Sequence, residues 1–398
     1  MRYGVGQMMA SAELAAAAQR RFLSAGYFPA FDGLRGVAIC GVIWHHALPR
    51  PYPGWLGRGH VGVPLFFALS GFLITTLLLA ERRSTGEIAL GSFWMRRCLR
   101  IFPLYYAVLG AFALSLAWRE PTLGTRHFFD NLPFYASYTS NWFVDFGVPH
   151  PIWFGFAWSL STEEQFYLWW PLLLCRCQRW GTWAPAAGLL GVVALDQLGE
   201  HGAWAAWVIA GGAPERILTS VSGAMALGAL LALGLADTRV FGWVWRLLGR
   251  RYSAPVCLVL AGALIWRPWG PPLLLELLLA SLVAACALGP QYGLQRGLTA
   301  RPLLRIGRVS YGLYLLHVPM LGLLRNVFPW LVERPSLAFP AALLSTFGVA
   351  SLCYRYVEAP ILAHQQRFRP ARALAREDRD GSIVTVLREP RDPLVREA

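Results

Sequence analysis

The chain has 398 residues, of which 56% are hydrophobic, 14% are aromatic and only 15% are charged. This composition excludes an ordinary soluble protein and is typical of a polytopic membrane protein. The formal net charge of +14 rests on arginine, because none of the 36 basic residues is a lysine.

Apolar runs long enough to cross the ~30 Å hydrocarbon layer of a membrane as helices recur along the chain. The expected fold class is therefore all-α, a polytopic transmembrane helical bundle of about ten spans. The apolar stretch at 202–211 is too short to cross and is expected to re-enter the membrane or to lie at its surface. The ten predicted spans are 31–48, 60–80, 101–118, 155–175, 182–198, 214–235, 252–267, 271–289, 309–330 and 336–357.

The arginines test this count independently, because cytoplasmic loops of membrane proteins carry an excess of basic residues. With both termini in the cytoplasm, 27 arginines fall on the cytoplasmic side, 8 fall on the other side, and Arg35 lies within the first span. We therefore predict that both termini are cytoplasmic. The positive charge then reflects topology and contact with anionic lipid, and it does not indicate a nucleic acid partner.

The ends of the chain and the cysteines carry weaker signals. Residues 1–28 lack the apolar region and cleavage site of a signal peptide, so we expect a cytoplasmic N-terminal segment followed by an uncleaved signal anchor. The arginine-rich tail at 362–398 is expected to be cytoplasmic and disordered. The seven cysteines fall in spans or at their cytoplasmic ends, which argues against disulfides. No histidine or second cysteine pair accompanies Cys175 and Cys177, so we expect no metal site.

The first span carries Arg35 and His46 in the otherwise apolar stretch RGVAICGVIWHH. Eleven helical residues make three turns plus about 20°, so both side chains share one helix face, about 16 Å apart along the axis. His45 points roughly 100° away from His46. Ionisable groups inside a membrane are costly and usually functional. The alternatives are that Arg35 extends to the interface and that His46 only bonds to a neighbouring helix.

A second arginine cluster, RRCLRIFP at 96–103, opens the third span at the same cytoplasmic surface. Arg97 and Arg100 are three residues apart and point the same way. Together with Arg35 they form a candidate pocket for an anionic ligand. Guanidinium groups bind phosphate through paired hydrogen bonds, which suits a coenzyme A thioester. The alternative is a cluster that only anchors the loop on the cytoplasmic side.

Polar side chains also interrupt four other predicted spans. A pair of small residues permits the close approach of a helix or a ligand, and carboxylates within a span are costly unless they pair or face water. The residues are Ser70 and Gly71 in the second span, Glu163 and Glu164 near the outer end of the fourth, Tyr314 and His317 in the ninth, and Glu358 at the cytoplasmic end of the tenth.

In their order along the chain, these stretches resemble the acyltransferase-3 family of integral membrane O-acyltransferases. They are R-x10-H, FFALSGFLIT, RRCLRIFP, WSLSTEEQFYLWWP, SYGLYLLHVP and YRYVEAP, and they cover 29–361, which we take as the acyltransferase domain. The resemblance implies a ten-span fold that takes an acyl group, often acetyl, from cytoplasmic acyl-CoA. The group is passed to a hydroxyl of a sugar, glycolipid, polysaccharide or secondary metabolite. Some members append an SGNH-type domain, which we do not expect fused to this chain.

The resemblance places the family's motif arginine and histidine at Arg35 and His46, and its R-x-x-R motif at Arg97 and Arg100. Acyl transfer requires the attacking hydroxyl to lose its proton, so we expect a neutral His46 to act as general base. Glu163 is expected to bind acceptor hydroxyls or to orient another polar group, and a covalent acyl intermediate stays open. The predicted catalytic residues are His46, Arg35 and Glu163, and the predicted donor-binding residues are Arg35, Arg97, Arg100 and Ser70.

A transporter or flippase of an anionic or glycosidic substrate is the alternative from another class, with the same charges lining its pathway. Against it, corresponding halves of the chain show no paired helices broken by glycine or proline. We expect an O-acyltransferase of the inner (plasma) membrane that uses acyl-CoA, with acetyl-CoA as the expected donor. Its expected partners are membrane lipid and a carbohydrate or other hydroxyl-bearing acceptor, and the sequence leaves a homo-oligomer open.

Overall fold

The computed structural model describes residues 2–48, 54–149, 152–177, 181–200, 214, 216–217, 220–267, 271–289 and 294–368. Within these ranges the chain is helical and contains no strand, as the fold class predicts. The stretch at 202–211 lies outside the described residues, and so does the predicted tail from 369 onward.

Each of the ten predicted spans overlaps a helix, although the helix in the predicted span 214–235 begins only at Gly223. Three helical stretches are long and apolar enough to cross a membrane, namely Gly54–Thr85, Leu90–Ala117 and Pro335–Ala363. A fourth such span would be formed by α11 (Gly223–Ala236) and α12 (Thr238–Leu248), which meet at a bend of 114°. The count of ten spans and the side of the termini remain predictions. The ten helices are α2 (Pro29–Ala47), α3 (Gly62–Thr85), α4 (Leu90–Ala117), α8 (Ala157–Arg176), α9 (Trp183–Glu200), α11 (Gly223–Ala236), α13 (Ser253–Trp266), α14 (Pro272–Leu288), α17 (Ser310–Val327) and α18 (Pro335–Cys353).

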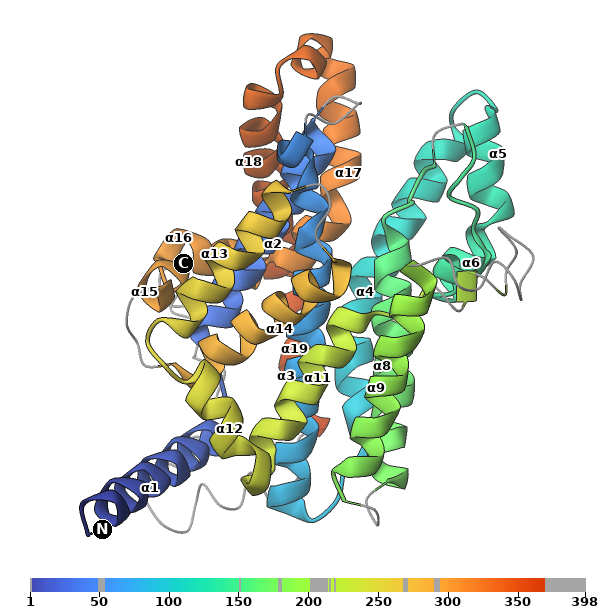
Figure 1. Ribbon diagram of the computed structural model, residues 1–398. Helices are drawn as coiled ribbons and strands as arrows, with labels where there is room; N and C mark the ends of the chain where they lie inside the picture. Colours follow the sequence, from blue (N-terminus) through green and yellow to red (C-terminus); the bar gives the residue numbers. More distant parts are fainter. Residues whose placement is uncertain are drawn as a thin grey trace.

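Shorter helices connect these elements. The longest of the remaining helices, α1, projects from one end of the molecule, and α5 lies at the opposite end (Figure 1). The connecting elements are α1 (Arg2–Ser24), η1 (Gly54–Val61), α5 (Leu123–Asp130), α6 (Leu132–Ala136), α7 (Ser140–Phe143), α12 (Thr238–Leu248), α15 (Leu294–Leu298), α16 (Arg301–Arg308), η4 (Pro329–Glu333), η5 (Tyr354–Glu358), α19 (Ala359–Ala363) and η6 (His364–Phe368).

Local sequence signals mark several helix ends. Pro29 and Pro335 occupy the first turns of α2 and α18. The N–H groups of a first turn have no partner within the helix, so proline, which lacks an N–H, costs no helical hydrogen bond there. Helix α3 ends at Gly86, whose φ of 90° is a left-handed conformation that glycine adopts at low cost. These signals set the start of α2 and the end of α3.

Two glycines bring α3 and α11 into close contact at the centre of the molecule. Gly71 of α3 lies against the main chain of Met225, and Gly228 of α11 lies against the main chain of Ala68. A larger residue at either position would collide with backbone atoms, so the small side chains permit this approach. The prediction that the Ser70-Gly71 pair allows another helix to approach closely is confirmed for Gly71.

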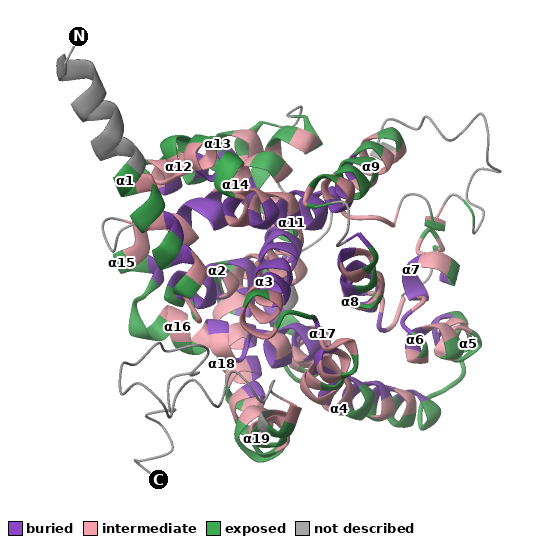
Figure 2. Cartoon of the chain, turned by 90° about the horizontal axis from the view of Figure 1, so that it is seen from below, coloured by how far each residue is buried: buried purple, intermediate pink, exposed green. Residues whose placement is uncertain are grey.

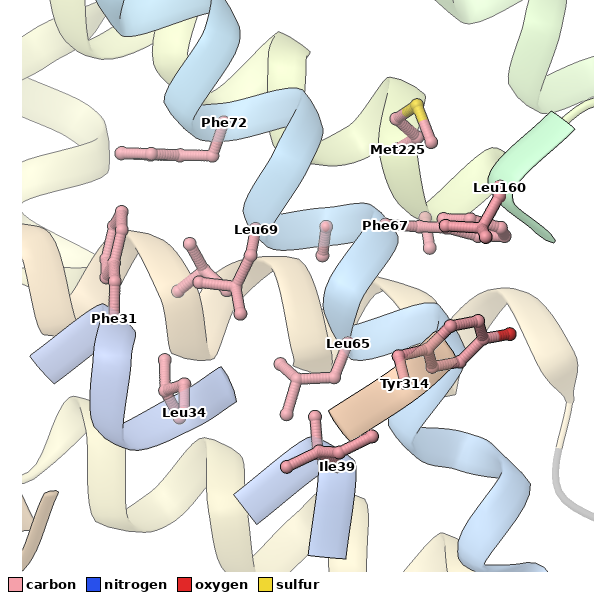
Figure 3. Packing of buried hydrophobic residues seen from close by; sticks show 14 of the residues in the cluster. Phe31, Leu34, Ile39, Leu65, Phe67, Leu69, Phe72, Leu160, Met225 and Tyr314 are labelled. Atoms are coloured by element: carbon pink, nitrogen blue, oxygen red, sulfur yellow. The ribbon is translucent and has the colours of Figure 1, made fainter. Parts of the chain in front are cut away.

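The core is built mainly on α2, α3, α8 and α11, and the buried residues of α2, α3 and α11 concentrate in the middle of the bundle (Figure 2). Between α2 and α3, the ring of Phe31 meets Phe72 edge to face at 5.6 Å. Leu34, Leu65 and Leu69 pack beside this pair (Figure 3). This packing fixes α2 against α3, and it therefore fixes the direction in which Arg35 points.

Large apolar side chains are also exposed on the outward faces of several helices. A soluble protein rarely exposes contiguous apolar surface on this scale, whereas a lipid-facing surface requires it. This exposure and the apolar helices are typical of a membrane protein. The exposed residues include Leu190 of α9, Val256, Val259 and Leu260 of α13, Leu274 and Leu277 of α14, and Leu337, Leu344 and Leu352 of α18.

Candidate functional site

Helices α2, α3, α4, α8 and α17 converge on a cavity of about 850 Å³, a volume that includes its open mouth. Arg35 of α2 faces it from one side, and Arg97 and Arg100 face it from α4. Glu163 and Glu164 of α8 also contribute to its wall. The three arginines predicted to form one anionic-ligand pocket therefore do lie around one cavity, and Ser70 lines it as well.

Arg35 is held by a neighbouring carboxylate, Asp32, which is not among the predicted site residues. Its Nη1 donates to Asp32 Oδ1 at 3.1 Å, and the hydroxyl of Tyr27 donates to Asp32 Oδ2 at 2.5 Å. The i,i+3 spacing of Asp32 and Arg35 on one helix was the signal that could have predicted this pair. Asp32 is buried, and its ion pair with Arg35 holds the guanidinium group in the cavity wall.

Arg97 lies among aromatic rings. Its guanidinium group sits 5.4 Å from the ring centroid of Tyr167 and 5.7 Å from that of Phe93. A planar guanidinium stacks on such rings while its N–H groups remain directed at other partners. The rings of α4 and α8 thus fix the orientation of Arg97 in the cavity wall.

Glu163 lies about two turns into α8, in the same cavity as the arginines, and it forms a hydrogen-bonded group with Ser70 and Tyr167. The hydroxyls of Ser70 and Tyr167 both donate to Glu163 Oε1. Tyr167 also contacts Ser70 Oγ at 3.1 Å. From the sequence, Glu163 is predicted near the outer end of its span as a catalytic residue, and Ser70 is predicted to bind the donor. The structure joins the two residues directly, which gives the buried carboxylate hydrogen-bond donors.

His46 lies at the other end of α2 and is not among the residues that line the cavity. Its Nδ1 is 2.9 Å from the main-chain oxygen of Val42. A carbonyl oxygen can only accept, so this contact assigns the hydrogen to Nδ1 and leaves Nε2 as the basic nitrogen of the neutral ring. With this tautomer, Nε2 is the nitrogen of His46 that can accept a proton.

His46 is one of four histidine rings that lie in a row. The ring centroids of His60 and His45 are 5.2 Å apart, as are those of His45 and His46. The rings of His46 and His317 are separated by 4.8 Å. The row runs from His60, which is exposed, to His317, which is fully buried. The sequence marks His317 as a polar residue of the ninth predicted span, but it does not predict the contact with His46, because the two residues lie on helices far apart in the chain.

Tyr314 connects the buried end of this row to the cavity. Nδ1 of His317 lies 2.6 Å from the main-chain oxygen of Tyr314. The Tyr314 hydroxyl lies 2.5 Å from Ser159 Oγ, and both residues line the cavity. The site thus has a basic end at Arg35, Arg97 and Arg100 and an imidazole end at His46 and His317, with hydroxyl groups between them.

No cluster of three metal-ligating side chains occurs in the described part of the chain. The cavity supplies guanidinium groups for an anion, and the histidine row supplies bases for a proton. Together they suit the transfer of a group from an anionic donor to a hydroxyl.

Comparison with known proteins gives matches over most of the chain. The family model described as acyltransferase domain matches residues 28–355. The peptidoglycan O-acetyltransferase OatA of Listeria monocytogenes is 30% identical over 363 residues, which are 84% of this chain and 56% of the relative. The putative peptidoglycan O-acetyltransferase YrhL of Bacillus subtilis is 28% identical over 365 residues, 84% of this chain and 55% of the relative.

A putative O-acetyltransferase of Staphylococcus aureus is 38% identical over 156 residues, which cover 37% of this chain and 25% of the relative. The chain spans about half the length of the first two relatives. No solved structure matches it.

Proposed function

The chain belongs to the acyltransferase-3 family, and on that premise we propose that it is a membrane O-acyltransferase. It transfers an acyl group, acetyl in the first instance, from cytoplasmic acyl-CoA to a hydroxyl of a glycan or glycolipid. The observation that carries this proposal is the placement of Arg35, Arg97 and Arg100 around one cavity.

The arginines suit the donor because a coenzyme A thioester carries several phosphate charges on one end and the reactive acyl group on the other. Guanidinium groups bind phosphate oxygens through paired, charge-assisted hydrogen bonds. Arg97 and Arg100 lie toward the start of α4, which we place at the cytoplasmic surface. The donor's thioester then points toward Ser159 and Tyr314 at the far side of the cavity.

The transfer itself requires a base. The acceptor oxygen forms a bond to the acyl carbon as its O–H bond breaks, and the C–S bond of the thioester breaks with its electron pair leaving on sulfur. We assign the acceptor proton to His46, whose tautomer leaves Nε2 basic. Glu163 is bonded to Ser70 and Tyr167, so we assign it to ordering the cavity wall beside Arg97.

The acceptor is proposed from the relatives. The two that cover most of the chain are named for peptidoglycan, so a cell-wall glycan is the first acceptor to test. The acceptor reaches His46 from the side of the membrane opposite to the donor, since His46 lies on α2 about 16 Å along the helix axis from Arg35.

The proposed topology has ten spans in the plasma membrane, with both termini cytoplasmic and residues 119–154 on the outer side. We expect single cysteines introduced near the C-terminus of a cysteine-free variant to resist a membrane-impermeant thiol reagent in intact cells. Cysteines introduced within 119–154 should react with it. Labelling at the C-terminus from outside would contradict the ten-span arrangement.

The proposed reaction is tested with the full chain in liposomes, given acetyl-labelled acetyl-CoA and solubilised peptidoglycan strands. We expect free CoA to appear together with labelled, alkali-sensitive acetyl groups on the glycan. A transporter or flippase, the alternative function, would move a substrate without releasing CoA. Label that stays on CoA in the presence of glycan would contradict the acyltransferase proposal.

A further inference from the structure

Arg325 of α17 has no role in the proposed reaction, although it is bonded to the residue that we assign as the base. Its Nη2 donates to the main-chain oxygen of His46 at 2.7 Å. This bond joins the last turn of α17 to the last turn of α2, and the two helices pack against each other. The side chains of Arg325 and His46 are both half-buried, so each keeps part of its surface accessible.

The guanidinium group of Arg325 has hydrogen-bonding capacity to spare. A guanidinium group has five N–H donors and is always charged. The bond to a neutral carbonyl oxygen uses one donor and leaves the charge without a counter-ion. In the described part of the chain, the carboxylates that form ion pairs are Asp32 and Glu81, and neither is paired with Arg325.

The elements around this end of α2 are basic. Segment η1, which packs on α2, contains Arg58 and His60 and no acidic residue. The last two turns of α2 and the whole of α17 contain histidine and arginine but no acidic residue. The acidic residue of the connection that follows α17 is Glu333, which is exposed at the end of η4. The end of α2 therefore presents positive charge to an approaching ligand.

The proposed topology puts this end of α2 on the outer side, from which the acceptor approaches. Arginines on the cytoplasmic side are explained by topology alone. That explanation does not extend to Arg325, which is one of the eight arginines predicted on the other side. The acceptor hydroxyl must reach Nε2 of His46, so an acceptor in place lies close to the side chain that is bonded to His46 itself.

We propose that Arg325 binds a carboxylate of the acceptor, so that the enzyme prefers hydroxyl acceptors that carry a carboxylate near the acylated hydroxyl. A guanidinium group binds a carboxylate through paired, charge-assisted hydrogen bonds. Its bond to the His46 oxygen then fixes where the bound carboxylate lies relative to the base. Peptidoglycan strands, the acceptor proposed above, carry free carboxylates. This inference rests on the proposed function.

The test measures acetyl transfer by the full chain in liposomes to two matched acceptors. One is solubilised peptidoglycan strands, and the other is the same strands with their carboxylates converted to neutral methyl amides. We expect the wild type to have a kcat/KM about tenfold or more higher for the intact strands, as for one charge-assisted contact. Arg325→Gln should remove this preference through a higher KM for the intact strands. Glutamine keeps an N–H donor for the His46 oxygen but loses the charge.

Arg334→Gln is the matched control. Arg334 is also predicted on the outer side, but its guanidinium group lies over the ring of Trp330, at 5.7 Å from the centroid. We expect this variant to keep the wild-type preference for intact strands. Arg325→Lys keeps the charge without the planar fork, so it should keep only part of the preference. If Arg325→Gln does not insert into the membrane, the lysine variant decides, since recognition by Arg325 requires a preference below that of the wild type.

Equal kcat/KM values of the wild type for the two kinds of strand would overturn the inference, and so would a wild-type preference in the Arg325 variants. An equal loss on both acceptors in Arg325→Gln would also overturn it, because Arg325 would then only hold the end of α2 in place. These outcomes leave the acyltransferase function intact, since the wild type still acetylates a glycan. Failure of the wild type to acetylate either kind of strand would overturn both proposals.

Discussion

Replacing His46 by alanine is expected to reduce acyl transfer by a factor on the order of a hundred or more, the usual loss when a general base is removed. The protein should remain folded and inserted, because the His46 ring is only half-buried and lies at the end of α2. The measurement is the initial rate of acetyl transfer to glycan at saturating acetyl-CoA, with membrane insertion checked in parallel.

His45→Ala is the control for this change, since His45 is the next residue but points about 100° away around the helix. It should retain substantial activity. Activity of the wild type should also fall as the pH is lowered, because protonated His46 cannot accept a proton. An active His46→Ala together with an inactive His45→Ala would contradict the assignment of the base, and His317 would become the next candidate.

Replacing Arg97 or Arg100 by alanine is expected to weaken acetyl-CoA binding about ten- to a hundredfold, since a hydrogen bond to a charged group contributes about 1.5–3 kcal/mol. Arg97→Lys should rescue binding only in part. Lysine keeps the charge, but it loses the planar group that now lies over the rings of Tyr167 and Phe93. Calorimetry or equilibrium binding of acetyl-CoA to the purified chain measures these Kd values.

Arg96 provides a matched control one residue away. Its Nη2 is paired with Glu81 at 2.8 Å, and it is not among the residues that line the cavity. Arg96→Ala should therefore leave the Kd for acetyl-CoA unchanged. Unchanged affinity in both Arg97→Ala and Arg100→Ala would mean that these arginines serve only to anchor the loop at the cytoplasmic surface.

The helices could be predicted from the sequence because their signal is local. A membrane span needs a run of about 20 apolar residues, and such runs can be read without knowing what packs against them. Proline at a first turn and glycine after a last turn, as at Pro29 and Gly86, narrow the ends further. The connecting helices between spans, such as α5 and α16, carry no comparable run, and the sequence analysis did not predict them.

The three arginines of the cavity could be brought together because each lies in the first half of its helix. Arg35 and Arg97 are both within the first two turns or so of α2 and α4, so a common membrane surface was enough to place them near one another. The meeting of His46 with His317 depends on how far α2 and α17 are rotated against each other. That rotation is set by tertiary packing, which local periodicity does not contain.

The hydrogen bonds of Glu163 illustrate the same limit. Its contacts with Ser70 depend on the depth at which α8 lies against α3, and that depth follows from the packing of whole helices. Asp32 differs, since it is a neighbour of Arg35 on one helix face and could have been recognised from spacing alone.

Helix α2 carries Arg35 near one end and His46 at the other, and it is helical from Pro29 to Ala47. At 1.5 Å per residue the eleven steps between them set a distance of about 16 Å along the axis. The helix therefore fixes the distance between Arg35 and His46. Under the proposed assignment, an acetyl thioester without the nucleotide is too short to reach from Arg35 to His46. An inhibitor that joins a phosphate group to an acceptor mimic should then bind both residues only when its linker spans this distance.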